Sequence, residues 1–227
     1  MKIGIFGTGV VGQTIAAALA AKGHTVMIGT RDPKATLERD SGNAFSKTPF
    51  RDWQKANPDI SLGTFAETAR FAEAIVNATS GDGALPALQA AGAAALGSKV
   101  MLDIANPLDF SKGMPPTLSV CNTDSLGEQL QRAFPKLRVV KTLNTTNALV
   151  MVNPGLVAGG DHSMFVCGND ADAKGKVKQW LGEWFGWRDV IDLGDITTAR
   201  GTEMLLPIWL RLCGALGTPM FNFKIAR

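Results

Sequence analysis

The residues best suited to chemistry form a glycine-rich hexapeptide near the N-terminus, made of Gly7, Thr8, Gly9, Val10, Val11 and Gly12. Their spacing is GxGxxG. The first glycine permits a tight turn, the second lets the backbone approach a pyrophosphate, and the third lets a helix pack closely on a strand. A helix that begins in such a loop presents oriented N–H groups and a partial positive charge to phosphates. The hexapeptide therefore predicts a dinucleotide site.

Two alternatives compete for the same loop. The segment GTGVVGQT is one substitution away from a P-loop, but Gln13 stands where that loop needs a lysine to reach the β- and γ-phosphates. Without this charge a nucleoside triphosphatase is disfavoured. The other alternative is a glycine turn that binds nothing. It is disfavoured because the loop lies between a clear strand and a clear helix.

The residues after the second expected strand discriminate between cofactors. Folds that bind NAD place an Asp or Glu there, whereas this chain has Thr30 and Arg31, with Lys34 one turn later. An arginine can hold a 2′-phosphate through two hydrogen bonds and stack on adenine. Asp32 lies one residue further on and is expected to cap the turn before Pro33. Arg31 could also be an ordinary surface residue, but NADP(H) is the expected cofactor.

Ligands of doubly wound sheets bind outside the carboxyl ends of the strands. Three strand ends carry small or polar residues that suit this position. These candidates for cofactor contact are Ala78, Thr79 and Ser80 after the fourth strand, Ala105 and Asn106 after the fifth, and Asn144 after the sixth. For each residue, ordinary loop or capping chemistry is the alternative.

No acid–base pair stands out, and the catalytic residues are left unassigned. Lys141 and His162 are weak candidates. A lysine at a strand end is more often an ion-pair or phosphate partner, and a capping or turn role is favoured for His162. This scarcity favours hydride transfer between two ring cofactors, which depends on positioning rather than on a strong base.

Alternating strand and helix patterns must position these residues. Strands are expected at 2–6, 24–29, 60–62, 74–78, 99–104 and 138–142, with helices between most of them, which predicts an α/β fold with a doubly wound, mostly parallel sheet. Residues 33–60 are expected to form an irregular connection with one short helix near Trp53, and 107–118 a loop.

A change of pattern near residue 147 suggests two parts, a dinucleotide-binding domain at 1–147 and a small C-terminal α/β domain at 148–227 that closes the cleft. The second part is expected to hold strands at 164–167 and 190–193 and helices at 171–185 and 198–213. Alternation in FNFKI (221–225) predicts a terminal edge strand, which makes a homodimer plausible.

Composition narrows the class of protein. A hydrophobic fraction of 45% in 227 residues excludes a mainly disordered chain. With 23 basic and 20 acidic residues the net charge is only +3, and the sequence lacks the basic tract that is typical of nucleic-acid binding. No apolar run is long enough to span a membrane, and glycines interrupt the N-terminal stretch that imitates a signal peptide. A cytoplasmic protein with three free cysteines and no metal site is expected.

Several segments together resemble the family of NADP oxidoreductases that use the deazaflavin coenzyme F-420 (F420). They are KIGIFGTGVVG, HTVMIGTRDP, VNAT, LDIANPL, VVKTLNTTN, DHSMFVCGNDADAK and DLGDITTARGTEML. The resemblance implies a Rossmann-type fold, with a short C-terminal domain over the nicotinamide and the deazaflavin between the domains. It implies that Thr8, Thr30, Arg31 and Lys34 handle the phosphates of NADP. It also implies that Thr79, Asn106 and Asn144 lie along the cleft and that the helix at 203–207 borders the second ring.

The acceptor is less specific than the cofactor. Cytoplasmic domains of metalloreductases share the same pattern and pass hydride to a flavin. This chain also departs from the family where Ser80 and Gly81 follow Thr79 and in the longer 33–60 connection. The expected function is hydride transfer between NADP(H) and a deazaflavin or flavin. The alternatives are an NADPH-dependent reductase of a small carbonyl or imine compound, with Lys141 or His162 as proton donor, and a non-catalytic NADPH sensor.

Overall fold

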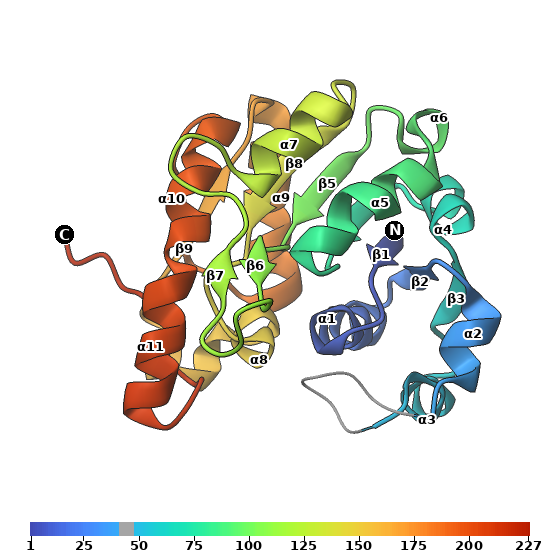
Figure 1. Cartoon of the computed structure of the whole chain (residues 1–227), viewed down its shortest axis with the longest axis horizontal. Coiled ribbons are helices and arrows are strands. Elements are labelled where there is room, and N and C mark those ends of the chain that lie inside the picture. The colour runs from blue at the N-terminus through green and yellow to red at the C-terminus, as the bar shows by residue number, and fades with distance from the viewer. Residues whose placement is uncertain (41–47) are drawn as a thin grey trace.

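The computed structural model describes residues 1–40 and 48–227, and an eight-stranded sheet lies at its centre (Figure 1). The strand order is β10-β9-β8-β5-β4-β1-β2-β3. The strands are β1 Lys2–Phe6, β2 Thr25–Thr30, β3 Ser61–Thr64, β4 Ala74–Asn77, β5 Val100–Asp103, β8 Arg138–Thr142, β9 Ser163–Cys167 and β10 Asp189–Asp192. All neighbours are parallel except β8 and β9, which are antiparallel. The predicted doubly wound, mostly parallel sheet is confirmed.

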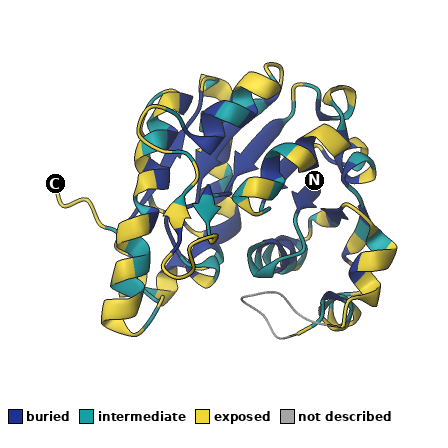
Figure 2. Ribbon diagram, viewed as in Figure 1, coloured by how far each residue is buried: buried dark blue, intermediate teal, exposed yellow. Residues whose placement is uncertain are grey.

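Helices cover both faces of this sheet, because its central strands carry apolar side chains on both sides and each side must be shielded from water. One face packs against α1 (Val10–Ala21), α8 (Ala148–Val152) and α9 (Ala171–Trp180). The other face packs against α4, α5, α6 and α7. Their bounds are Phe65–Phe71, Gly81–Ala91, Ala93–Leu96 and Leu126–Ala133. Figure 2 shows buried strands and exposed outer helix surfaces.

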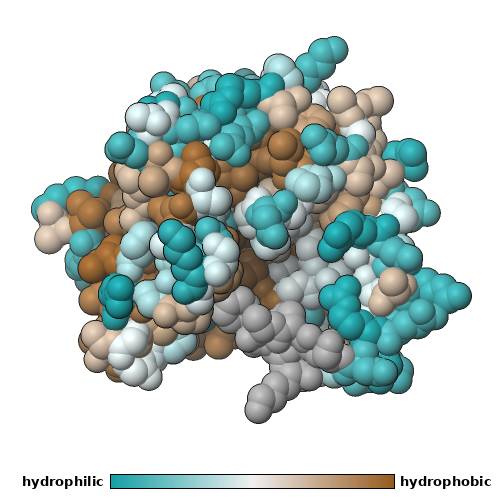
Figure 3. Space-filling view, in the orientation of Figure 1, coloured by the Kyte–Doolittle hydropathy of each residue, from teal (hydrophilic) through white to brown (hydrophobic). Residues whose placement is uncertain are grey.

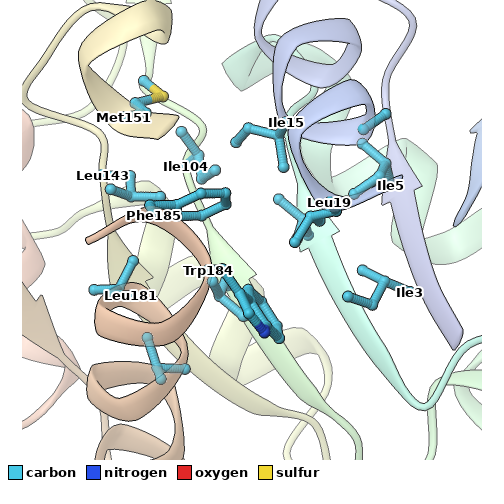
Figure 4. Packing of buried hydrophobic residues seen from close by; sticks show 14 of the residues in the cluster. Ile3, Ile5, Ile15, Leu19, Ile104, Leu143, Met151, Leu181, Trp184 and Phe185 are labelled. Carbon is cyan, nitrogen blue, oxygen red and sulfur yellow. The ribbon is translucent and has the colours of Figure 1, made fainter. Parts of the chain in front are cut away.

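Alternation along each strand divides the core into two layers. Ile3 and Ile5 of β1 point toward α1, where Ile15 and Leu19 meet them, whereas Phe6 points to the opposite face. Figure 4 shows the first layer continuing from these residues to Trp184 and other side chains of the C-terminal half. A single apolar layer therefore joins the N-terminal and C-terminal parts of the chain.

The 33–60 connection contains more helix than expected. The helix near Trp53 is present as α3 (Phe50–Ala56), but a second helix, α2 (Pro33–Glu38), was not predicted. It forms because the carboxylate of Asp32 accepts a hydrogen bond from the Ala35 N–H and Pro33 occupies the first turn. At six residues it is too short to show an apolar period. Residues 41–47 of the predicted connection lie outside the described part of the chain.

Two expected helices are each divided into two, and one expected loop contains a hairpin. The helix expected over 84–95 is split between α5 and α6 at Gly92, whose φ is 83°. The helix over 198–213 is divided into α10 (Ala199–Met204) and α11 (Leu206–Leu216), with Pro207 at the start of the second. The predicted loop at 107–118 carries a short antiparallel hairpin, β6 (Leu108–Asp109) and β7 (Thr117–Leu118).

The predicted edge strand at 221–225 is wrong. This tail has no strand, although Ser163 donates its N–H to the Phe223 carbonyl and Asn222 donates to the Ser163 carbonyl. β8 pairs only with Val166 and Cys167, so the start of β9 at Ser163 is open, but the tail makes isolated hydrogen bonds there and no ladder. Alternation of phenylalanines here reflects contacts such as the stack of Phe221 on Trp209.

The sheet continues across residue 147. Lys141 of β8 pairs with Cys167 of β9, so the C-terminal strands extend the same sheet rather than forming another. The division at 147 stays a prediction.

Candidate functional site

The glycine loop between β1 and α1 has the close approaches that its sequence predicts. Gly7 adopts a φ of 116°, and a Cβ there would lie 2.5 Å from the Ala78 carbonyl oxygen. A Cβ on Gly12 would lie 2.2 Å from the Gly7 carbonyl oxygen. Gln13 donates from Nε2 to the Thr8 carbonyl at 2.8 Å and so braces the loop. Because Gly9 at the N-cap has no side chain, it leaves room in front of the first N–H groups of α1.

The tip of β2 carries cations whose positions suit a phosphate. Thr30 is buried and hydrogen-bonded to Thr36 at 2.9 Å, whereas Arg31 and Lys34 are exposed. In residues 1–40 and 48–227 nothing pairs with the Arg31 guanidinium, and Lys34 lies 3.9 Å from Glu38. As predicted, Asp32 is used as the cap of α2. Its carboxylate therefore compensates helix N–H groups and not Arg31.

Hydrogen bonds tie together the carboxyl ends of β4 and β5. Asn77 donates from Nδ2 to Asp103 at 2.8 Å, and Thr79 donates from Oγ1 to Asn77 at 2.8 Å. A Cβ on Gly81 would lie 2.3 Å from the Asn106 carbonyl oxygen, so the loops after the two strands touch. This contact explains why the chain needs a glycine at position 81.

The end of β8 joins the same group. Asn106 donates from Nδ2 to the Asn144 carbonyl and Asn144 donates from Nδ2 to Asn106 Oδ1, both at 2.9 Å. The structure thus places Ala78, Thr79, Asn106 and Asn144 side by side with Gly7 at one edge of the sheet. Ser80, at the N-cap of α5, and Ala105 lie on the same loops.

Two hydroxyl groups beside Asn144 lie in the polar run after β8, whose amide and hydroxyl groups are predicted from the sequence to suit a nicotinamide carboxamide. Thr145 and Thr146 are 1% and 7% exposed, and their Oγ1 atoms have no hydrogen-bond partner among the described residues. An unpaired buried hydroxyl is unfavourable, so such atoms indicate a ligand or water. Together with the glycine cradle they fit a dinucleotide that extends along this edge. Their only signal in the sequence is the polar run that follows β8.

Lys141 lies at the centre of a buried ion cluster. Its Nζ is 2.8 Å from Asp103, 2.7 Å from Glu203 and 2.5 Å from the Ala105 carbonyl oxygen. Burial alone would lower the pKa of Lys141, but the two carboxylates outweigh it and raise the pKa above its usual value. An ammonium held in this way is a poor proton donor near neutral pH.

Glu203 was predicted only to border the second ring, and its role in this cluster was missed. Its carboxylate also accepts the N–H groups of Leu126 and Gly127 at 2.9 and 3.0 Å, at the start of α7. A sequence signal existed in part, since Asp103 and Lys141 are charged residues in two apolar strands. The structure places them opposite each other in β5 and β8.

His162 is also fully engaged. The imidazole is 3% exposed, with Nε2 at 2.9 Å from the Pro154 carbonyl oxygen and Nδ1 at 2.8 Å from Asn222 Nδ2. Since Asn222 Nδ2 is a donor, Nδ1 accepts and Nε2 donates, which fixes a neutral tautomer. The ring also meets Trp187 edge-on. These contacts give His162 a role in packing.

A pocket of about 560 Å³ lies between the β6–β7 hairpin and the C-terminal helices. It is lined by Pro115, Pro116, Thr117, Leu118, Cys121, Met204, Pro207 and Arg211. Figure 3 shows apolar surface on the side of the molecule where α10 and α11 lie. The hairpin begins directly after Asn106 and Pro107, so a short segment connects the pocket to the edge of the sheet that carries Asn106 and Asn144.

Two further properties concern the whole described chain. No helix among the described residues is long and apolar enough to cross a membrane. In the same residues, no group of three or more His, Cys, Asp and Glu side chains could hold a metal ion. Cys121 is exposed, Cys213 is half-buried and Cys167 is buried, where burial raises the pKa of its thiol to about 11.

Comparison with known proteins places these features in context. Residues 2–107 match the family described as NADP oxidoreductase, coenzyme F420-dependent. A crystal structure from Arthrobacter sp. FB24, provisionally assigned as an F420-dependent NADP reductase, is 62% identical, covers all of both chains and superposes with a TM-score of 0.95.

More distant matches carry other names. The metalloreductase STEAP3 of Rattus norvegicus is 26% identical over 216 residues, which is 92% of this chain but only 38% of that protein. An imine reductase from Streptomyces aurantiacus is 14% identical, with a TM-score of 0.61 over 96% of this chain and 64% of its own. At that identity the likeness shows the fold alone.

Proposed function

The chain belongs to the family of coenzyme F420-dependent NADP oxidoreductases, and from this premise we propose that it transfers a hydride between NADP(H) and the ring of a deazaflavin or flavin. That it is an NADP-dependent oxidoreductase follows from the family. The choice of a ring acceptor rests mainly on one observation. Lys141 and His162, the candidate proton donors, are buried and fully engaged, so the site is built for positioning.

The pyrophosphate and the 2′-phosphate are proposed to bind at the glycine loop and at the tip of β2. The loop, with Thr8 and the N-terminus of α1, would hold the pyrophosphate. Arg31 would contact the 2′-phosphate, with Thr30 and Lys34 beside it. The exposure of Arg31 and its lack of a partner in the described residues support this role, because its hydrogen-bond donors are available to a ligand.

The nicotinamide is proposed to lie over the joined ends of β4, β5 and β8. Ala78, Thr79, Ser80, Ala105, Asn106 and Asn144 would line it. The unpaired hydroxyls of Thr145 and Thr146 support this placement, since a carboxamide could satisfy them. Bound NADPH would supply the hydride from nicotinamide carbon 4, and these residues would orient its ring.

The acceptor ring is proposed to enter beside the β6–β7 hairpin, where residues 148–227 would cover the nicotinamide end. The pocket there is lined largely by apolar side chains, among them Leu118, Met204 and Pro207, which suits a planar ring. Arg211 at the same pocket could face an anionic group of the acceptor. A flavin is the second candidate, as the resemblance to the cytoplasmic domains of metalloreductases implies, and the relative STEAP3 is named a metalloreductase.

The test is stopped-flow oxidation of NADPH against a deazaflavin, FMN and a ferric chelate, with NADH as the comparison donor. We expect rapid transfer from NADPH to at least one ring acceptor and slow transfer to the ferric chelate alone. Tight NADPH binding without oxidation by any ring would instead identify a sensor. Turnover of a small imine or carbonyl compound that survives alanine at Lys141 and His162 would require another proton donor.

A homodimer in the cytoplasm is part of the proposal. Support for a dimer comes from α11, whose apolar side chains are mostly not buried: Ile208 and Leu216 are 49% and 57% exposed. An exposed apolar helix face is typical of an interface. Light scattering after gel filtration tests the mass, and Ile208→Lys should produce monomers if α11 forms the contact.

A further inference from the structure

Asp103, Lys141 and Glu203 form a continuous chain of buried charges, here called the ion chain. Its side chains are 0%, 0% and 2% exposed. An ammonium has three N–H donors, and Lys141 uses them on Asp103, Glu203 and the Ala105 carbonyl. Every charged group is therefore paired, and the geometry is fixed by three contacts at one nitrogen.

The ion chain reaches the nicotinamide side through the loop after β5. Lys141 binds the carbonyl of Ala105, and Asp103 Oδ1 accepts the Ala105 N–H at 3.3 Å. The same Oδ1 accepts from Asn77, which in turn accepts from Thr79. Two residues proposed to line the nicotinamide, Thr79 and Ala105, are thus attached to this network.

The other end of the ion chain reaches the acceptor side. Glu203 belongs to α10 and holds the first N–H groups of α7. The next residue, Met204, and Pro207 line the pocket beside the hairpin. A shift of Glu203 would consequently move one wall of the pocket.

We propose that Lys141 is a positioning residue that sets the separation between the nicotinamide and the acceptor ring. Its Nζ binds both the Ala105 carbonyl in the loop after β5 and the Glu203 carboxylate in α10, and so fixes the loop relative to the helix. This inference rests on the proposed placement of both rings. Stability alone is a weak reason for such an arrangement, because well-packed apolar residues commonly stabilise a core as well as a buried ion pair does. What the ion chain adds is a fixed geometry between two loops and a helix.

The variant that tests this is Lys141→Gln with Glu203→Gln, which removes one cation and one anion and so keeps the net charge of the cluster. Lys141→Met is a second, harsher variant. The matched control is Arg200→Gln with Glu128→Gln. Arg200 and Glu128 form an ion pair at 2.6 Å that also joins α10 to α7, but neither residue contacts Ala105.

Two ligands separate positioning from general damage. Adenosine 2′,5′-bisphosphate carries the adenine end of NADPH but no nicotinamide. In the Gln/Gln variant we expect its Kd to change by less than about twofold, while hydride transfer in a single turnover slows by about tenfold or more. The Kd of NADPH should rise more than that of the bisphosphate, and the control pair should change neither quantity.

Equal weakening of both ligands, or an unchanged transfer rate, would overturn the positioning role. If Lys141→Met does not fold, the Gln/Gln variant carries the test. If the wild-type protein transfers no hydride to any ring, the proposed function fails, but the positioning role is still tested. An unchanged ratio of the NADPH and bisphosphate Kd values would then refute it.

Discussion

Replacing Arg31 by glutamate should convert a preference for NADPH into indifference between NADPH and NADH. Arg31 is exposed and unpaired within the described residues, so its interaction with a 2′-phosphate takes place in nearly aqueous surroundings. Two unit charges 4 Å apart in water interact by about 1 kcal/mol. A phosphate monoester carries a charge of about −1.5 to −2 near neutral pH. The substitution changes the local charge by two units, so binding of the phosphate is weakened by about 3 to 4 kcal/mol before screening.

Salt reduces this effect. With a Debye length of about 8 Å at physiological ionic strength, about 2 kcal/mol remains. That corresponds to a rise of about 30-fold in the Kd of NADPH. NADH lacks the 2′-phosphate, so its Kd should change by less than about twofold. Titration calorimetry at low and high salt measures both values, and the loss of NADPH affinity should be smaller at high salt.

A matched charge reversal gives the control. Lys22 is exposed at the C-terminal end of α1, one helix length or about 18 Å from the glycine loop, which is well beyond the Debye length. Lys22→Glu should leave both Kd values unchanged. If Arg31→Glu weakens NADPH and NADH equally, or if Lys22→Glu matches its effect, then Arg31 does not bind the 2′-phosphate.

Four further outcomes are expected. Gly12→Ala inserts a Cβ 2.2 Å from a backbone oxygen, so it should destabilise the fold by about 3 kcal/mol and abolish NADPH binding. In contrast, Gly175→Ala, where a Cβ meets open space within α9, should stabilise it by about 0.5 to 1 kcal/mol. Lys141→Met leaves two buried carboxylates without a cation, so it should lower the free energy of unfolding by about 3 to 5 kcal/mol. Calorimetry should then show a fall in Tm of about 6 to 20 °C, and a fall below about 2 °C would contradict the argument that these carboxylates need the Lys141 ammonium. Hydrogen bonds from Arg132 lower the pKa of Asp124, so this pair stabilises the fold above about pH 4 and less as pH falls further. Urea titrations should therefore show Asp124→Asn less stable than wild type by about 1 kcal/mol at pH 7, with the difference shrinking toward pH 2, whereas a difference that is independent of pH would contradict this account.

Local patterns in the sequence predicted most of the scaffold. The six strands of the main sheet that precede residue 147, the helices between them and the glycine loop depend on neighbouring residues, so their signals are present in short windows. The cap at Asp32 was predicted for the same reason. The helix that it caps, α2, was not predicted because six residues are too few to show the apolar periodicity of a helix.

What the sequence did not predict depends on contacts between distant segments. Alternation at 221–225 suggests a strand, but the tail makes only isolated hydrogen bonds to the start of β9. The ion chain joins Lys141 to Glu203, which lies in a helix far along the chain. No local pattern marks such a pairing, although two charged residues in apolar strands signal that partners must exist. The unpaired hydroxyls of Thr145 and Thr146 became visible only when their burial was known.

The antiparallel joint between β8 and β9 also decides where this scaffold tolerates inserted sequence. Thr142 pairs with Val166 and Lys141 with Cys167, so β9 starts at the edge where we propose that the cofactor binds and runs away from it, and β10 follows in parallel. The loops after β9 and β10 therefore lie at the opposite edge of the sheet. Asn169 in the first of these loops is exposed, but its side chain accepts the Ile196 N–H at 3.1 Å, so a reporter domain inserted there would stand clear of the proposed cofactor site and would disturb this contact. An insertion after β4 or β5 would fall directly on the proposed site.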